Sequence, residues 1–465
     1  MKKNIFIKSL IALVFIGALS ACSDMLNEED LKTNPNSPSD ASLDNILIGV
    51  LIGVGEQHED TEVRIASLWS GQLAGRSRQH QTFGVYTVSS STFGWFNQYN
   101  IIANARLGQA KANDQGNSIV KGILQVSEAL IFAKLTALYG DIPFTQVAND
   151  EFPTPIYDDQ VSVVYPGIIS LLDAAIVNLN AGTGGTFSDF LGGGSADAWI
   201  AAANTLKARL YLHLGDYSSA VSAAQDGISD VSGDILMYHG SSQTFDQNLN
   251  YDFFYNNRSG DTDFDAPSIF GTVMQSLNND KTNNAALDYH IHNNAGEGDF
   301  PNTNDGMFVV DAPHPILTHF ENQMILAEAA TRDGDAAAGL AALNDVRAEL
   351  ATGNFYGLTI NPDTQALGLQ YDAYVDGDFA TDADLLAEIV KQKYVLLIMQ
   401  YENWNHTRRL EALGELDVLG LVSTNAPTDN RLPGRFPYPQ GEINTNPNTP
   451  PVGDDEQYNK LAIFQ

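Results

Sequence analysis

Two stretches of the sequence, residues 69–86 and 245–264, combine aromatic rings with amide, carboxylate and guanidinium groups. This combination suits a sugar, because the apolar C–H faces of a pyranose ring stack on aromatic side chains while its hydroxyl groups need polar partners alongside. One further aromatic residue lies just beyond the first stretch. The residues expected to contact such a ligand are Trp69, Arg76, Arg78, His80, Phe83, Tyr86, Trp95, Tyr251, Phe254, Tyr255 and Asn257.

Packing inside the protein is the alternative for several of these residues. Burial would explain Trp69 equally well, and ion pairs with the abundant carboxylates would explain Arg76 and Arg78. Trp95 immediately precedes a helical segment, which favours a structural role. A hairpin that buries one face would account for the aromatic run 251–255.

Catalytic and metal-binding patterns are weak in this sequence. Residues 261–265 read Asp-Thr-Asp-Phe-Asp and begin like a calcium loop, but Ala266 stands where glycine is needed and Thr272 where glutamate is needed. There is no Gly-x-Ser-x-Gly motif, and Cys22 is the only cysteine. We therefore expect a non-enzymatic protein without catalytic residues, metal or cofactor. A secreted glycoside hydrolase remains an alternative, because abundant Asp and Glu form acid pairs by chance.

The N-terminus has the features of an export signal. Lysines at positions 2, 3 and 8 precede a short apolar run, and Leu-Ser-Ala-Cys follows at 19–22. A basic start, a short apolar core and small residues before a cleavage point are typical of a secretory signal peptide. We expect residues 1–21 to be removed, Cys22 to carry a lipid, and the acidic residues 22–40 to form a flexible tether. A signal without lipidation is the alternative.

The composition excludes several classes of partner. The formal net charge is −33, and the signal contains three lysines and no acid, so the mature chain is more acidic still. Such a charge opposes binding to nucleic acid, to anionic lipid and to polyanionic ligands, and leaves neutral ligands unaffected. After the signal, no second apolar stretch is expected to reach membrane-spanning length.

Helical periodicity predicts a mostly α-helical protein. The strongest segments are 123–139, 165–179, 196–214, 320–331, 336–350 and 385–409. Residues 201–229 and 320–350 both read helix, Gly-Asp, helix with small residues at matching positions, which is similar to the tetratricopeptide repeat. Residues 231–315 lack a sustained period, and we expect them to form loops with short strands packed on the helical scaffold.

Five short motifs, taken in this order, resemble the SusD/RagB family of nutrient-binding outer-membrane lipoproteins of Bacteroidetes. The motifs lie at 137–144 (ALYGDIPF), 199–211, 325–330, 401–410 and 435–448. The resemblance covers nearly the whole chain. It implies a single SusD-like domain over 41–465, with four tetratricopeptide-like helix pairs forming a scaffold and a loop-rich half that carries short strands, notably in 231–315.

The resemblance also implies a function. A protein of this kind would lie on the cell surface, anchored by lipid in the outer membrane, and would bind a polysaccharide or oligosaccharide. It would deliver the oligosaccharide to a TonB-dependent, SusC-like transporter barrel, and the acidic charge favours neutral glucans. A tetratricopeptide-like scaffold that binds a peptide or a protein is the alternative.

Overall fold

The computed structural model describes residues 41–465 except 244, 284–286, 295–297, 357, 360–367, 426–429, 452 and 454. The chain separates into two units, Met1–Ile46 and Leu47–Gln465, and the elements below belong to the second except for the first residues of α3. The predicted signal, the tether and Cys22 lie outside the described residues.

Helices dominate the structure, and the prediction of a mostly α-helical protein is confirmed. The long helices are α3 (Leu43–His58), α4 (Thr61–Trp69), α6 (Phe96–Asp114), α7 (Ser118–Tyr139), α8 (Tyr165–Ala181), α9 (Ala196–His213), α10 (Tyr217–Gln225), α14 (His319–Arg332), α15 (Ala336–Ala351), α17 (Asp382–Leu396) and α18 (Tyr401–Leu413). Shorter helices are α5 (Arg78–Gly84), α11 (Leu249–Tyr251), η5 (Asp252–Asn257), α12 (Phe270–Ser276), α13 (Leu287–His290) and α19 (Gln440–Thr445). Single turns are η2 (Ser90–Thr92), η3 (Gln160–Val164), η4 (Val231–Gly233), η7 (Asp376–Asp378), η8 (Leu416–Val418), η9 (Glu456–Tyr458) and η10 (Ala462–Phe464).

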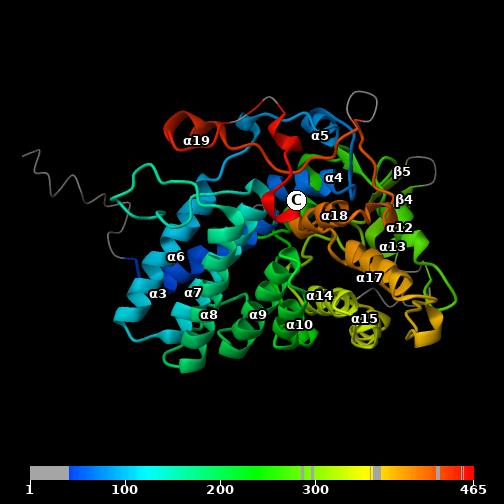
Figure 1. The fold of residues 1–465 in the computed structure, drawn as a ribbon, viewed down its shortest axis with the longest axis horizontal. Helices are drawn as coiled ribbons and strands as arrows, with labels where there is room; N and C mark the ends of the chain where they lie inside the picture. Colours follow the sequence, from blue (N-terminus) through cyan, green and yellow to red (C-terminus); the bar gives the residue numbers. More distant parts are fainter. Residues whose placement is uncertain are drawn as a thin grey trace, which may run out of the picture. The chain divides into compact units, whose positions relative to one another are not determined.

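Successive long helices pack against one another in chain order. α6 contacts α7, α7 contacts α8, and the series continues through α9, α10, α14 and α15 (Figure 1). The predicted pairs correspond to α9 with α10 and α14 with α15. Asp216 and Asp335 begin the second helix of each pair, where their carboxylates accept hydrogen bonds from the backbone N–H groups of Ser219 (3.1 Å) and Ala338 (2.9 Å).

Small residues allow the two helices of a pair to approach closely. A Cβ atom added to Gly339 on α15 would lie 2.9 Å from the carbonyl oxygen of Ala327 on α14. Between the pairs, Ala208, Ala224 and Ala329 share one buried cluster. Close packing at matching small residues is the feature that the repeat pattern predicts.

Two details differ from the sequence-based expectations. The segment 385–409 forms two helices, α17 and α18, because the chain turns at Met399, whose φ is +55°. Gln160–Ala181 is apolar and long enough to span a membrane, with a mean hydropathy of 1.6, which corrects the expectation that no such stretch follows the signal. About a third of this stretch is buried within the fold, where α8 contacts both α7 and α9.

The irregular region 231–315 contains short paired strands, as expected, and also α11, α12 and α13. β2 (Ile235–Met237) pairs with β6 (His314–Leu317), and β4 (Ile291–Asn294) with β5 (Gly298–Pro301). β1 (Ala74–Gly75) pairs with β3 (Thr262–Asp263), and β7 (Asn354–Phe355) with β8 (Leu358–Thr359). All four pairs are antiparallel.

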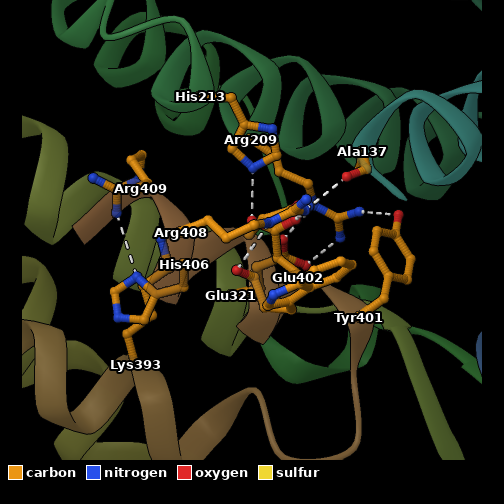
Figure 2. Close-up of polar contacts among 12 residues, drawn as sticks. Ala137, Arg209, His213, Glu321, Lys393, Tyr401, Glu402, His406, Arg408 and Arg409 are labelled. Carbon is orange, nitrogen blue, oxygen red and sulfur yellow. Dashed lines mark hydrogen bonds and ion pairs between the residues drawn. The ribbon is translucent and has the colours of Figure 1, made fainter. Parts of the chain in front are cut away.

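A buried ionic network ties α9, α14 and α18 together (Figure 2). Arg209 donates to both carboxylate oxygens of Glu321 (2.6 and 2.7 Å), and Nε2 of His213 lies 2.8 Å from Glu402. Burial alone would raise the pKa of Glu402, but His213 and Arg209 lower it to about 2. These charges are compensated within the scaffold, so the network holds helices together and offers no open site.

Candidate ligand-binding site

The two stretches that the sequence analysis singled out lie side by side in the structure. β1 of the first stretch pairs with β3 of the second, with Ala74 opposite Asp263 and Gly75 opposite Thr262. Gly75 allows the backbone of His80 to approach closely, because a Cβ atom on residue 75 would lie 1.9 Å from the carbonyl oxygen of His80. The pairing brings residues almost 190 positions apart in the sequence into one surface.

Ion pairs stabilise the junction between the two stretches, where β1 pairs with β3. The buried carboxylate of Asp261 accepts hydrogen bonds from Ser77 Oγ (2.7 Å) and from the guanidinium of Arg78, and its Oδ2 lies 3.0 Å from Nδ1 of His80. Arg76 Nε donates to Asp263 at 2.5 Å. Burial would raise the pKa of Asp261, but these hydrogen bonds lower it below its usual value. Arg76 and Arg78 therefore make the ion pairs that the sequence analysis left open as their alternative role.

The first hollow at this junction has polar walls and a volume of about 720 Å³. We call it the polar hollow. The end of α3, the start of α4, α5, the start of α6 and the segment 249–258 contribute to it, with Glu56, Gln57, Glu59, Asp60, Thr61, Arg64, Gln79, His80, Asn97, Leu249, Asp252, Phe253, Asn257 and Arg258 lining it. Its size falls within the range of about 300–1,000 Å³ typical of small-molecule sites.

The polar hollow mixes charges of both signs. Arg64 donates to the carbonyl oxygen of Glu59 (2.8 Å) and lies 4.7 Å above the ring of Phe253, and burial lowers its pKa. Burial also lowers the pKa of His80, although the hydrogen bond with Asp261 acts in the opposite direction. Within the described part of the chain, the side chains of Gln79, Asn97 and Arg258 make no hydrogen bond, so these donors are available to a ligand.

Three of the predicted aromatic residues lie in the core. Trp69 is 1% exposed, its Nε1 donates to the carbonyl oxygen of Phe83 (2.9 Å), and its ring contacts Trp404 edge-on with ring centres 5.0 Å apart. Phe83 and Tyr86 are also buried, and the hydroxyl of Tyr86 accepts a hydrogen bond from the backbone N–H of Thr424. This burial favours a packing role for all three residues over contact with a ligand.

In the second stretch, two tyrosines form an exposed aromatic surface. Tyr251 and Tyr255 stack with ring centres 5.1 Å apart and planes at 20°, and Tyr255 is 57% exposed. Phe254 is buried against Phe308. Tyr255 borders a small hollow of about 210 Å³ that also includes Ser259, Thr303 and Asn304. Asn257 instead lines the polar hollow and donates to Asp252.

Trp95 lines a different hollow, which we call the aromatic hollow. It has a volume of about 630 Å³ and is bounded by residues 93–99, 143–155 and 439–446. Trp95 is 5% exposed and contacts Tyr139 edge-on. Of the predicted ligand residues, the structure therefore brings His80 and Asn257 together, holds Arg76 and Arg78 beside them, and places Trp95 elsewhere.

The polar hollow also includes residues that the sequence analysis did not single out. Residues 56, 57 and 59–61, at the junction of α3 and α4, and Arg64 form one of its walls. The sequence could have indicated this wall, because the run Glu-Gln-His-Glu-Asp-Thr at 56–61 is polar throughout although it joins two helices. The acidic segment 261–265 does not resemble a metal site, because Asp261 and Asp263 bind the cations described above. Within the described residues, no group of three or more potential ligands could hold a metal ion.

Comparison with known proteins identifies related sequences and folds. Residues 35–439 match a family model described as starch-binding and associating with the outer membrane. A SusD/RagB family protein of Bacteroides thetaiotaomicron superposes with a TM-score of 0.71 at 22% identity, covering 88% of this chain and 95% of that chain. Among curated proteins, none matches the sequence.

Two further solved structures share the fold. A SusD homolog of Bacteroides fragilis gives a TM-score of 0.68 at 18% identity and covers 91% of this chain and 100% of its own. A chitin-binding protein gives a TM-score of 0.63 at 19% identity and covers 86% of this chain and 94% of its own. At these identities the likeness concerns the fold.

Proposed function

Because this chain belongs to the SusD-like family, described as starch-binding and associating with the outer membrane, we propose that it binds an oligosaccharide in the polar hollow without cleaving it. The observation that carries the proposal is the position of this hollow. It opens where the two aromatic and polar stretches of the sequence are joined, and it contains unengaged amide and guanidinium donors.

The chemistry of the polar hollow matches a polyhydroxylated, neutral ligand. Sugar hydroxyl groups both donate and accept hydrogen bonds, so they can pair with the amide of Gln79 or Asn97 and with the carboxylate of Asp252. An anionic sugar would meet four carboxylates in the lining and the acidic field of the whole chain. We therefore propose a neutral glycan, such as a glucan. The stacked pair Tyr251 and Tyr255, of which Tyr255 borders the smaller hollow of about 210 Å³, offers a further ring face for a sugar.

We also propose a location for the protein and a cellular role that depends on it. We propose that residues 22–465 form the mature protein, that lipidated Cys22 and the tether 22–40 hold a single domain at the cell surface, and that the domain passes the glycan to a TonB-dependent transporter barrel. Purification of the full chain from outer membranes in mild detergent should recover such a barrel with it. Recovery of the protein alone under conditions that preserve other membrane complexes would count against this partner.

Calorimetry and chromatography on the purified protein test the binding proposal. Neutral oligosaccharides of the malto, cello, chito and xylo series are titrated into the wild type and into Gln79→Ala and Asn97→Ala. We expect at least one series to bind, each substitution to weaken binding by about ten-fold, and no product to form. Asn180→Ala, at an exposed position on α8, is the matched control. Release of shorter products would instead support the hydrolase alternative.

A further inference from the structure

The aromatic hollow and the polar hollow are lined by neighbouring residues at the start of α6. Phe96 lines the aromatic hollow and the next residue, Asn97, lines the polar hollow. Successive side chains on an α-helix point about 100° apart, so two neighbouring residues can face two different spaces. The first turn of α6 therefore contributes to the walls of both hollows.

The walls of the aromatic hollow are apolar and include exposed rings. Phe96 is 76% exposed and Phe152 is 40% exposed, although large apolar side chains are usually covered. Trp95 and Tyr99 lie in the same lining, together with prolines at 143, 153, 155 and 439. Exposed apolar rings gathered in one hollow mark an interaction site rather than scattered surface residues.

The polar groups of this hollow are engaged with one another, and they fix its shape. Nδ2 of Asn446 donates to Glu442 (2.8 Å) and to the carbonyl oxygen of Pro155 (2.9 Å). The hydroxyl of Tyr99 donates to the carbonyl oxygen of Pro143 at 2.9 Å. These bonds join three segments that are distant in the sequence, so the hollow is formed before any ligand arrives. What it offers a ligand is mainly flat apolar surface.

We propose that the aromatic hollow holds the far part of a long oligosaccharide whose other part lies in the polar hollow. The chain crosses the first turn of α6 beside Phe96, and the apolar faces of its sugar rings stack on Phe96 and Phe152. This inference rests on the proposed function, since it needs a glycan in the polar hollow. It adds a selectivity for chain length, because a second contact made by the same chain strengthens binding without a second association event.

Oligosaccharides of two to seven units test the inference by calorimetry, in the series that the wild type binds. We expect Phe96→Ala and Phe152→Ala to weaken the seven-unit ligand by about ten-fold and to leave the two- and three-unit ligands unchanged. Asn97→Ala should weaken ligands of every length, because it lies in the polar hollow. Phe187→Ala removes a fully exposed phenylalanine outside both hollows and is the control. Thermal melts confirm that each variant folds.

The outcomes separate the inference from the function on which it rests. If no neutral oligosaccharide of any length binds, the proposed function is overturned and the inference with it. If short and long ligands bind the wild type equally, or if both phenylalanine variants keep full affinity for the seven-unit ligand, the inference alone is overturned. Weakening of short ligands by Phe96→Ala would also overturn it, since it would place that ring in the primary site.

Discussion

Arg408 is a buried cation whose hydrogen bonds go to neutral groups. Its guanidinium donates to the carbonyl oxygens of Ala137 (2.6 Å) and Gly434 (2.7 Å) and lies 3.8 Å above the ring of Trp404. Burial lowers its pKa to about 9. Through these bonds one side chain on α18 joins the end of α7 to the C-terminal segment, which explains why a planar group with several donors occupies this position.

Replacement of Arg408 by lysine should destabilise the protein by about 2–4 kcal/mol, because the ammonium group cannot reach both carbonyl oxygens and leaves buried acceptors unpaired. Urea denaturation followed by circular dichroism measures the change. Arg431→Lys, at an exposed ion pair with Asp455, should change the free energy of unfolding by less than about 0.5 kcal/mol. Equal effects of the two substitutions would show that the carbonyl contacts of Arg408 contribute little.

Asp234 is a buried carboxylate with one oxygen unpartnered among the described residues. The other oxygen accepts a hydrogen bond from the backbone N–H of His319 (2.6 Å) at the start of α14. Burial raises the pKa of Asp234 to about 8, against an ordinary value of 3.8. The folded state thus holds a proton that the unfolded state releases, so stability falls as the pH rises from about 4 to about 8.

The substitution Asp234→Asn should remove this pH dependence while keeping the acceptor oxygen for His319. We expect the variant to gain at least about 1 kcal/mol relative to the wild type between pH 5 and pH 8. Unfolding by urea at each pH unit measures the difference. Asp197→Asn, at an exposed position on α9, is the control for the loss of a carboxylate. A difference for Asp234→Asn that does not change with pH would mean that Asp234 is already ionised at pH 5.

At the scale of elements, the pairing of β1 with β3 joins the two stretches of sequence that contribute His80 and Asn257 to the polar hollow. Each strand has only two residues, so backbone hydrogen bonds alone cannot hold the two stretches together. Asp261 supplies the missing stability through Ser77, Arg78 and His80. Since the pKa of Asp261 is lowered, this contribution is complete above pH 4 and is lost as the pH falls further.

The substitution Asp261→Asn should loosen this junction and leave the helices intact. The amide cannot accept from all three donors, so we expect faster hydrogen exchange in 74–80 and 258–264 and a loss of glycan affinity of about ten-fold. Exchange in α9 and α14 should stay unchanged. Asp173→Asn, which removes a surface ion pair with Lys207, is the control. Exchange that rises equally throughout the protein would indicate global destabilisation instead.

Helices were predictable where the helical spacing of apolar residues continues over many residues. The helices of both repeat-like pairs follow from apolar spacing, and their junctions from Gly-Asp. The break at Met399 was not predictable, because the apolar period continues through it. The sequence left burial of Trp69 open as one of two alternatives, and it did not indicate the burial of Phe83 and Tyr86, because the path of 70–86 depends on tight turns and on the distant Asp261. The α3–α4 wall of the polar hollow comes from helix ends, which periodicity does not mark.

At the scale of the whole molecule, acidity and anchoring act together. A formal charge of −33 keeps the folded protein away from anionic surfaces, so electrostatic attraction cannot hold it on a membrane. A protein of this charge that works beside a membrane needs another means of attachment. The sequence offers one in Cys22, the only cysteine of the chain.

The substitution Cys22→Ser in the full-length chain should therefore move the protein from the membrane fraction to the soluble fraction. Metabolic labelling with a radioactive fatty acid should mark the wild type and not the variant, because serine provides no thiol for acylation. Glycan affinity of the purified variant should equal that of the wild type, since the polar hollow is formed by residues 56–258. A wild type that is unlabelled and already soluble would identify residues 1–21 as an ordinary signal, and would leave the proposed binding surface without an anchor at the membrane.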